Sequence, residues 1–327
     1  MAWKNLAQTD LSDALIQHHE ALEELDDINQ LIDWKLIEAK LSAIHSKKKG
    51  EQAWPPLMMF KILLLQSWYS LSDPKLEKQL ARDLMFRRFI NLGLSEGVPD
   101  HSTIWRFRNV LNKQSLLEPL LVEINEQLTE QGLLIKRGEI SIIDATVIEA
   151  HQSRPRKNKT GENTQDPEAG YNVKVAANGK KTSTYGYKAH INTDEEGFIK
   201  TVDYTAGNEH DSLSMEKLLT EKEKELYADK AYASKKHDQL LKEKGIVNRI
   251  LHKGKRNQAL SDKQKDQNRQ WSSIRSTVER VFGVLKLHHN ISKARYLGLE
   301  RNKTSFMLTA MAYNIKRGAN IKAERVV

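Results

Sequence analysis

Three acidic residues of this chain have the surroundings expected of metal ligands. Asp144 interrupts the apolar run ISIIDATV, where an unpaired carboxylate would be costly to bury. Asp229 ends the run LYAD, at the strand edge where α/β folds bind ligands, and Glu279 lies on the amphipathic segment of residues 271–286. Such carboxylates suit Mg²⁺, which is held by a few carboxylates together with waters and phosphate oxygens. Two such ions activate a water or a 3′ hydroxyl for in-line phosphoryl transfer.

Two alternative roles for these acids stay open at the level of sequence. Paired carboxylates also serve glycoside hydrolysis, and three such acids can have unrelated roles. The charge distribution favours a polyanion. Residues 230–327 contain 14 Lys and 9 Arg against 7 Asp and Glu, a net charge of +16, whereas the whole chain carries +9 and residues 1–229 therefore carry −7. A basic final third is typical of a nucleic-acid-binding surface, with an idle basic surface as the alternative.

Residues 271–286 are predicted to form a helix with two distinct faces. Arg275, Glu279 and Lys286 form a polar stripe along it. In one interpretation, Arg275 and Glu279 are an ordinary i, i+4 ion pair on a solvated face. In the other, Glu279 binds a metal ion while Arg275 and Lys286 bind phosphates. The helix alone does not decide between them. An apolar stripe with helical spacing faces the core: Ile274, Val278, Val281 and Leu285.

The elements that position these residues begin near residue 139, where helical periodicity gives way to strand periodicity. Strands and helices then alternate after an initial hairpin, which indicates an α/β fold with a mixed sheet covered by helices, the element order of ribonuclease-H-like proteins. Residues 252–270 are expected to be a basic linker. The predicted elements are strand 140–147, hairpin strands 184–192 and 198–204, helix 213–224, strand 225–228, helix 234–244, strand 246–251, and helices 271–286 and 301–317.

A long polar excursion is expected over residues 154–183, which contain few apolar residues. Its basic side chains are either DNA contacts or part of a solvated charged loop. They are Arg154, Arg156, Lys157 and Lys159.

Residues 1–135 are predicted to form an all-α domain that precedes a catalytic domain over residues 136–327. Asp73 and Ser102 are expected to be helix N-caps. The short helices in this region suit a helix-turn-helix that carries Arg106 into a major groove. A helical bundle whose arginines are merely solvated explains the same pattern. Helices are expected over residues 57–70, 73–88, 102–113 and 118–131.

The composition also excludes several classes of protein. The chain contains no cysteine, which excludes a disulfide scaffold and a cysteine-rich zinc site. Its N-terminus lacks the basic start and apolar run of a signal peptide. The most apolar segment, residues 57–71, is shorter than the roughly 20 residues that span a bilayer. We therefore expect a cytoplasmic protein.

Blocks of sequence around the three acids resemble a known family. IDATVIEA contains Asp144, YADKAY contains Asp229 and RSTVERVFGVLK contains Glu279, while QSWYSLSD, PDHSTIWRFR, GYKAHI and AGNEHD fit as well. Together they resemble the DDE transposases of bacterial insertion sequences, most closely insertion-sequence family five, over residues 55–317. The resemblance implies a ribonuclease-H-like catalytic core, an N-terminal region that binds terminal inverted repeats, and metal-dependent DNA cleavage and strand transfer.

The family's functional residues carry over position by position. Asp144, Asp229 and Glu279 match the catalytic triad, which implies Mg²⁺ as the metal, with Mn²⁺ as an alternative and two ions per site. The implied partner is double-stranded DNA at the element ends and the target, bound by a homodimer or higher oligomer associated with the nucleoid. The expected DNA contacts are Arg106, Arg108, Trp271, Arg275, Arg280 and Lys286.

One position departs from the family's tyrosine–arginine–glutamate–lysine signature, because Ser272 stands where the tyrosine is expected. The neighbouring Trp271 is either a base-stacking residue or a core residue. His210, in the AGNEHD block, either orients a water or a phosphate or is a structural histidine. The alternative function for the whole chain is a non-catalytic DNA-binding regulator derived from a transposase.

Overall fold

The computed structural model divides into two compact units, which are described separately. The helical unit comprises residues 1–133 and 307–327, and the sheet unit comprises residues 134–306. The basic residues Arg154, Arg156 and Lys159 lie outside the described part of the chain, and so does the junction between the predicted domains. The structure describes residues 3–4, 17, 19–44, 52–133, 139–151, 157–158, 161, 165–175, 179–220, 222–254 and 259–326.

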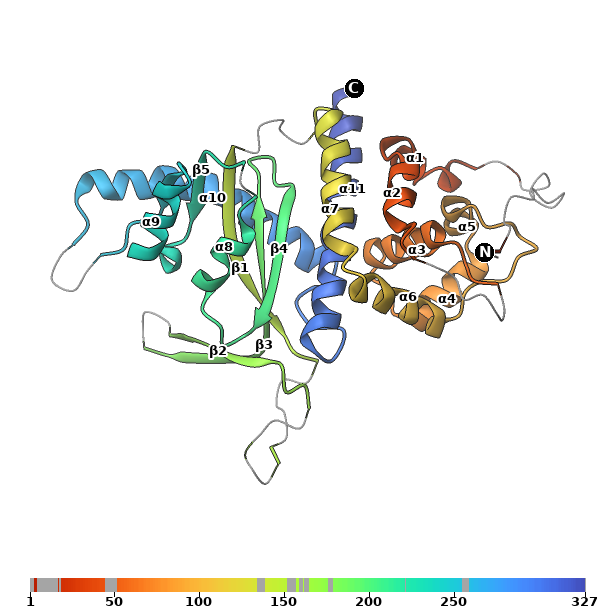
Figure 1. The fold of residues 1–327 in the computed structure, drawn as a ribbon, viewed down its shortest axis with the longest axis horizontal. Coiled ribbons are helices and arrows are strands. Elements are labelled where there is room, and N and C mark those ends of the chain that lie inside the picture. Colours follow the sequence, from red (N-terminus) through yellow and green to blue (C-terminus); the bar gives the residue numbers. More distant parts are fainter. Residues whose placement is uncertain are drawn as a thin grey trace. The chain divides into compact units, whose positions relative to one another are not determined.

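A mixed sheet forms the centre of the sheet unit (Figure 1). Its order is β4-β3-β1-β5-β6, and β2 pairs with the first half of β3. β3 runs antiparallel to β1, β2 and β4, whereas β5 runs parallel to both β1 and β6. The strands are β1 (Ile140–Glu149), β2 (Gly170–Val175), β3 (Lys181–Thr193), β4 (Ile199–Ala206), β5 (Glu225–Ala228) and β6 (Val247–Ile250).

β3 pairs with three strands, and Gly186 allows the close backbone approach at the point where they meet. β2 pairs with β3 up to Gly186, and β4 pairs with it from Tyr187 onward. A Cβ atom at Gly186 would collide with the carbonyl oxygen of Ile148 on β1. A residue without a side chain is therefore required where these strands meet.

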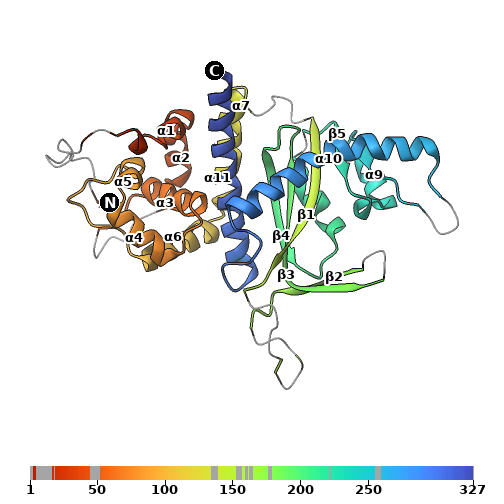
Figure 2. The same ribbon diagram turned by 180° about the vertical axis from the view of Figure 1, so that it is seen from behind.

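Helices cover both faces of the sheet. The long helix α10 packs against β1 and β5, while α8 packs against β3 and β4 on the opposite face, as Figures 1 and 2 show. A buried apolar cluster joins the strands to α8 and α9, and includes Ile143, Ala228, Met215 and Leu241. The elements are the 3-10 turns η3 (Asp211–Ser214) and η4 (Lys230–Tyr232) and the helices α8 (Met215–Leu218), α9 (Lys235–Glu243) and α10 (Asp262–His288).

Three expectations from the sequence differ from the structure. The polar excursion expected over residues 154–183 contains strand β2 (Gly170–Val175) and the first residues of β3, which pair with each other. The helix expected over residues 213–224 is only a short turn and α8, because Asn192 and Thr201 donate side-chain hydrogen bonds to the Leu218 carbonyl oxygen. That oxygen is then engaged by neighbouring strands instead of continuing the helix. The linker expected over residues 252–270 is partly helical, because a capping box between Ser261 and Gln264 starts α10 at Asp262.

The helical unit is built around α3, which is buried nearly all round. The final helix, α11, contributes its residues from Met307 onward to this unit. Trp68 Nε1 donates to the Ala312 carbonyl oxygen at 2.7 Å, and Asn314 donates to Asn125 at 2.8 Å. The C-terminal segment, which the sequence predicts to belong to the catalytic domain, therefore packs among the N-terminal helices. The elements are η2 (Glu20–Leu22), α1 (Asp26–Leu31), α2 (Trp34–Leu41), α3 (Pro56–Trp68), α4 (Asp73–Arg82), α5 (Leu84–Ile90), α6 (His101–Lys113), α7 (Leu117–Glu130) and α11 (Leu299–Val326).

The predicted N-caps of this unit are shifted. Asp100 rather than Ser102 caps α6, by accepting from the Thr103 backbone N–H. Asp73 lies inside the first turn of α4, and the helix expected over residues 73–88 is interrupted at Asp83, which caps α5. In the described part of the chain, no helix has both the length and the apolar character needed to cross a membrane.

Candidate active site

Asp144, within β1, and Asp229, directly after β5, lie side by side where the parallel pairing of these two strands ends. β1 and β5 pair in parallel, with Ile143 opposite Ala228. Asp144 and Asp229 are the next residues along each strand, and neighbouring strands lie about 4.8 Å apart. The two carboxylates are close enough for the charge of Asp229 to raise the pKa of Asp144. Parallel pairing therefore produces the paired aspartates that the sequence predicts.

Helix α10 provides the cation that contacts this pair. Arg275 Nη2 donates to Asp144 Oδ2 at 2.9 Å, and the same nitrogen lies 3.8 Å from Glu279 Oε1. The side chains of Arg275, Asp144 and Glu279 are 9%, 20% and 62% exposed. Arg275 is therefore a buried partner of Asp144, and the ion pair that the sequence suggests between Arg275 and Glu279 is the longer and more exposed of the two.

The burial of the Asp144 carboxyl disfavours its charged form. Burial raises the pKa of Asp144, Arg275 and the Ala145 N–H lower it, and Asp229 raises it, with an elevated pKa as the net result. The nearby Tyr232 hydroxyl is buried without a hydrogen-bond partner, and burial and these same acids hold its pKa well above the usual range. A cation between the two aspartates would favour the charged form of Asp144 and oppose the effect of burial.

The donor set fits Mg²⁺ or Mn²⁺ at two of the three predicted positions. Asp144 and Asp229 supply hard oxygen ligands, and one or two carboxylates with waters and substrate phosphates are a common Mg²⁺ arrangement. Glu279 does not join them here: within the described ranges, no three acidic or histidine side chains are grouped so that they could hold one ion. The role of Glu279 as a third ligand stays a prediction.

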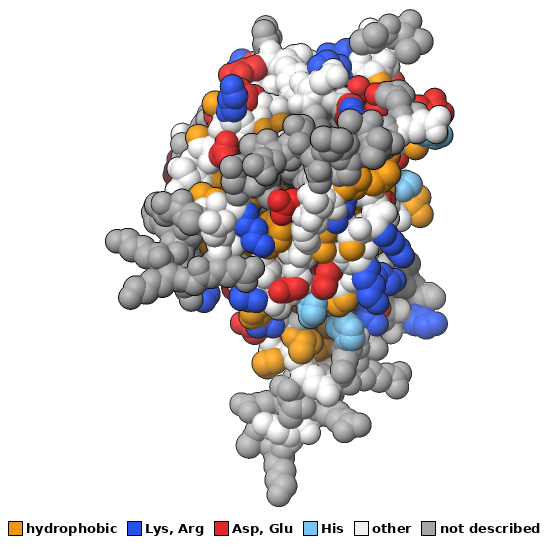
Figure 3. Space-filling model, turned by 90° about the vertical axis from the view of Figure 1, so that its right-hand side faces the viewer, with side chains coloured by type: hydrophobic (Ala, Val, Ile, Leu, Met, Phe, Trp, Pro, Cys, Tyr) orange, Lys and Arg blue, Asp and Glu red, His pale blue; other side chains and the backbone are white. Residues whose placement is uncertain are grey.

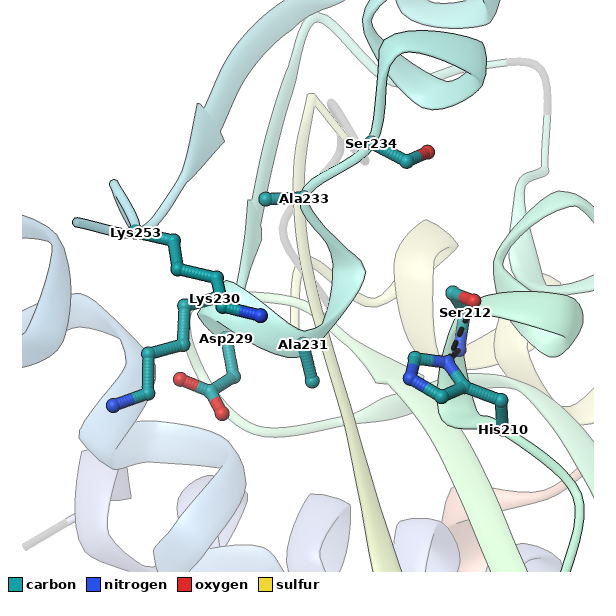
Figure 4. A pocket seen from close by; sticks show the side chains of 8 residues that line it. All are labelled: His210, Ser212, Asp229, Lys230, Ala231, Ala233, Ser234 and Lys253. Carbon is teal, nitrogen blue, oxygen red and sulfur yellow. Dashed lines mark hydrogen bonds between the residues drawn. The ribbon is translucent and has the colours of Figure 1, made fainter. Parts of the chain in front are cut away.

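A pocket of 360 Å³ is lined in part by Asp229. Figure 4 shows Asp229, Lys230 and Lys253 on one side of it and His210 and Ser212 on the other. His210 and Lys230 stand in the blocks AGNEHD and YADKAY, whereas Lys253 follows β6 in a basic segment that gives no sign of a pocket. Ala231, Ala233 and Ser234 complete the lining.

Comparison with known families identifies both parts of the chain. Residues 135–315 match the family model described as Transposase DDE domain, and residues 9–110 match the one described as Transposase domain (DUF772). The chain belongs to the transposase DDE domain family. The family supports a transposase function and implies a DNA substrate. No solved structure matches the chain.

The predicted DNA contacts on α10 of this transposase differ in exposure. Trp271 is 7% exposed, its ring packs 5.0 Å from that of His252, and its environment is that of a core residue. Arg280 is exposed and donates to the Thr277 hydroxyl at 3.0 Å. Lys286 is exposed as well, although partial burial and then nearby Lys174 lower the pKa of its ammonium group. Ser272 also lies on the exposed side of the helix.

The two arginines predicted to contact DNA from α6 have different environments. Arg106 is exposed and donates to the Ser102 hydroxyl at 2.6 Å. Arg108 is only 3% exposed, and its guanidinium is bound to Asp73 at 2.6 Å and Gln66 at 2.7 Å. Arg108 therefore stabilises the transposase's helical unit, which corrects its predicted role as a DNA contact. On the face shown in Figure 3, Lys and Arg side chains lie in separate groups among acidic and apolar ones.

Proposed function

We propose that this chain is the transposase of a bacterial insertion sequence of family five. It binds the terminal inverted repeats of the element and catalyses metal-dependent DNA cleavage and strand transfer. The observation that carries the proposal is the placement of Asp144 and Asp229 on adjacent parallel strands within the matched transposase domain. The strand order β4-β3-β1-β5-β6, with its antiparallel first half and parallel second half, supports a ribonuclease-H-like fold.

In this mechanism, Asp144 and Asp229 would hold Mg²⁺ or Mn²⁺, with Glu279 on α10 as the proposed third ligand. Bound ions of this kind activate a water or a 3′ hydroxyl and stabilise the leaving oxygen. Arg275 donates a 2.9 Å hydrogen bond to the Asp144 carboxylate, and it lowers the pKa of that carboxyl, which burial and Asp229 raise. The exposed cations Lys286 and Arg280 bind backbone phosphates of the DNA along α10.

The DNA partner follows from the same reaction. Two element ends must be cut and joined in one event, so we propose that a homodimer or higher oligomer assembles on DNA. We propose that the helical unit recognises the terminal inverted repeats, with Arg106 as its exposed candidate on α6. Neither assembly of an oligomer nor recognition of the repeats is required for the metal site itself, which lies wholly within the sheet unit.

A supercoiled plasmid that carries both element ends tests this function. The wild-type protein should cut at the ends only when Mg²⁺ is present. Asp229→Ala should bind end DNA with unchanged affinity and leave the plasmid uncut, because one of the paired metal ligands is gone. The control Asp266→Ala, which changes an exposed acid on α10, should cut as the wild type does.

Two results would count against the proposal. Mg²⁺-dependent cutting by Asp229→Ala would show that the site is assigned to the wrong residues. A wild-type protein that binds the ends tightly but never cuts them would instead support the non-catalytic regulator.

A further inference from the structure

The lining of the pocket beside Asp229 includes two lysines. Lys230 follows Asp229 directly on η4, and Lys253 enters from the segment after β6. Throughout the described part of the chain, neither ammonium group forms an ion pair. Two lysines without carboxylate partners at one pocket wall form a site for an anion.

His210 adds a hydrogen-bonding imidazole ring to the opposite wall. The Ser212 backbone N–H donates to His210 Nδ1 at 3.3 Å, and the Ser212 hydroxyl lies 2.7 Å from the same nitrogen. Because Nδ1 accepts a backbone hydrogen bond, Nε2 is the ring nitrogen that carries a proton. In Figure 4, Nε2 faces Ala231 and Asp229 across the pocket. The ring therefore presents a hydrogen-bond donor to whatever occupies this space.

The first turn of α9 contributes a further favourable field. Ser234 lines the pocket and is the N-cap residue of α9, which is nine residues long. The N-terminus of a helix carries a partial positive charge that favours anions. This partial charge at the start of α9 adds to the charges of the two lysines and to the hydrogen-bond donor of His210.

The lining suits the backbone of a nucleic acid better than a base. Its only apolar side chains are Ala231 and Ala233, and no Phe, Tyr or Trp of the described residues lines it, so an extruded base would lack an apolar ring to stack on. The volume of 360 Å³ lies near the lower end of the range for small-ligand sites, about 300–1,000 Å³. That space accommodates a phosphate with its sugar.

We propose that this pocket binds a backbone phosphodiester of the strand being cut, next to the phosphate at the metal site. Lys230 and Lys253 pair with its charged oxygens, and His210 Nε2 donates to it. Asp229 belongs to both the metal pair and the pocket wall, so a phosphate held here fixes the position of the neighbouring phosphate on the metal. The inference rests on the proposed function, because it assigns the pocket to the DNA of that reaction.

The proposed phosphodiester site can be tested by removing the charge of single phosphates in the DNA, one position at a time. Duplexes of the element end would each carry a single methylphosphonate, which removes the charge of one phosphate near the cut position. Binding would be measured without Mg²⁺, for the wild type, for Lys253→Ala and Lys230→Ala, and for the control Lys242→Ala, an exposed lysine of α9 outside the pocket.

Neutralising one phosphate adjacent to the cut should weaken wild-type binding by about tenfold, the size of one charge-assisted contact. The same methylphosphonate should cause a clearly smaller loss in Lys253→Ala and in Lys230→Ala, because one of the partners of that phosphate is already gone. Lys242→Ala should show the full tenfold loss. Equal losses in all four proteins at every phosphate would overturn the assignment.

The cutting assay separates this inference from the function on which it rests. A wild type that cuts the ends but shows no phosphate linked to Lys253 or Lys230 refutes the pocket assignment alone. A linked phosphate in a protein that never cuts with Mg²⁺ leaves the pocket as a phosphodiester site and refutes the catalytic function.

Discussion

Replacing Arg275 with Met tests how the paired aspartates are held in the absence of a metal. The Arg275 side chain is 9% exposed, and its Nη2 lies 2.9 Å from Asp144 Oδ2. Methionine keeps an apolar stem but removes the charge, which leaves the Asp144 carboxylate beside Asp229 without its cation. Removing one partner of a buried ion pair costs about 3–5 kcal/mol. Because Asp144 is 20% exposed, water offsets part of this, and we expect a loss of about 3 kcal/mol at pH 8.

The loss in free energy of unfolding should depend on pH, and the burial of Asp144 determines whether it grows or shrinks as pH rises. Burial raises the pKa of Asp144, and removal of Arg275 raises that pKa further. A carboxyl whose pKa is higher in the folded state contributes stability below its unfolded pKa, and this contribution is lost as pH rises through the folded pKa. The difference in free energy of unfolding between Arg275→Met and the wild type should therefore be largest at pH 8 and shrink toward about pH 4.

Urea unfolding followed by tryptophan fluorescence measures this difference at both pH values. The control Arg269→Met, which changes an 85% exposed side chain on the same helix, should alter the free energy of unfolding by less than about 0.5 kcal/mol. Mg²⁺ should stabilise Arg275→Met at lower concentrations than the wild type, because the guanidinium no longer competes for Asp144. An Arg275→Met protein as stable as the wild type at pH 8 would refute the reasoning that Asp144 depends on a buried cation.

His190, Arg108 and Lys286 each give a further prediction. Burial lowers the pKa of His190 from 6.5 to about 4, so the free energy of unfolding should fall by about 3 kcal/mol as pH drops from 7 to 4. In His190→Asn, urea unfolding should show that this part of the pH dependence has disappeared. Arg108→Met should lower the free energy of unfolding by about 3 kcal/mol, because Asp73 loses its cation. Binding of end DNA, measured below the melting transition, should stay unchanged. A loss of DNA binding without a loss of stability would restore Arg108 as a DNA contact. Lys286→Ala should weaken DNA binding and reduce the slope of log affinity against log salt by about 1, whereas an unchanged slope would argue against a phosphate contact.

Local patterns in the sequence predicted the strands β1, β4, β5 and β6 and most of β3, but not β2, which lies in a segment with few apolar residues. Asp144 and Asp229 each end or interrupt a short apolar run, and parallel pairing of two such runs brings them together. The start of α10 was also readable, because Ser261 and Gln264 have the spacing of a capping box, although the basic composition of the segment favoured a linker. These features depend on residues close together in the chain.

The features that sequence patterns did not reveal depend on distant partners. Arg275 and Asp144 are 131 residues apart, and no local pattern indicates that the guanidinium turns toward a strand rather than toward Glu279. The predicted helix after residue 213 fails because side chains of β3 and β4 engage the Leu218 carbonyl oxygen. Arg108 carries the same charge as an exposed arginine, and only the packing of α3, α4 and α6 shows that it is buried.

Sulfur substitution at the phosphate that is cut tests most directly whether metal held by Asp144 and Asp229 performs the reaction. End duplexes would carry a single phosphorothioate of defined stereochemistry at that position, and cutting would be timed with Mg²⁺ and with Mn²⁺. Mg²⁺ prefers oxygen ligands, whereas Mn²⁺ tolerates softer ones. We predict that one stereoisomer is cut far more slowly than unmodified DNA in Mg²⁺ and that Mn²⁺ restores its rate. Equal rates for both stereoisomers and for unmodified DNA in the two metals would contradict a metal bound to the reacting phosphate.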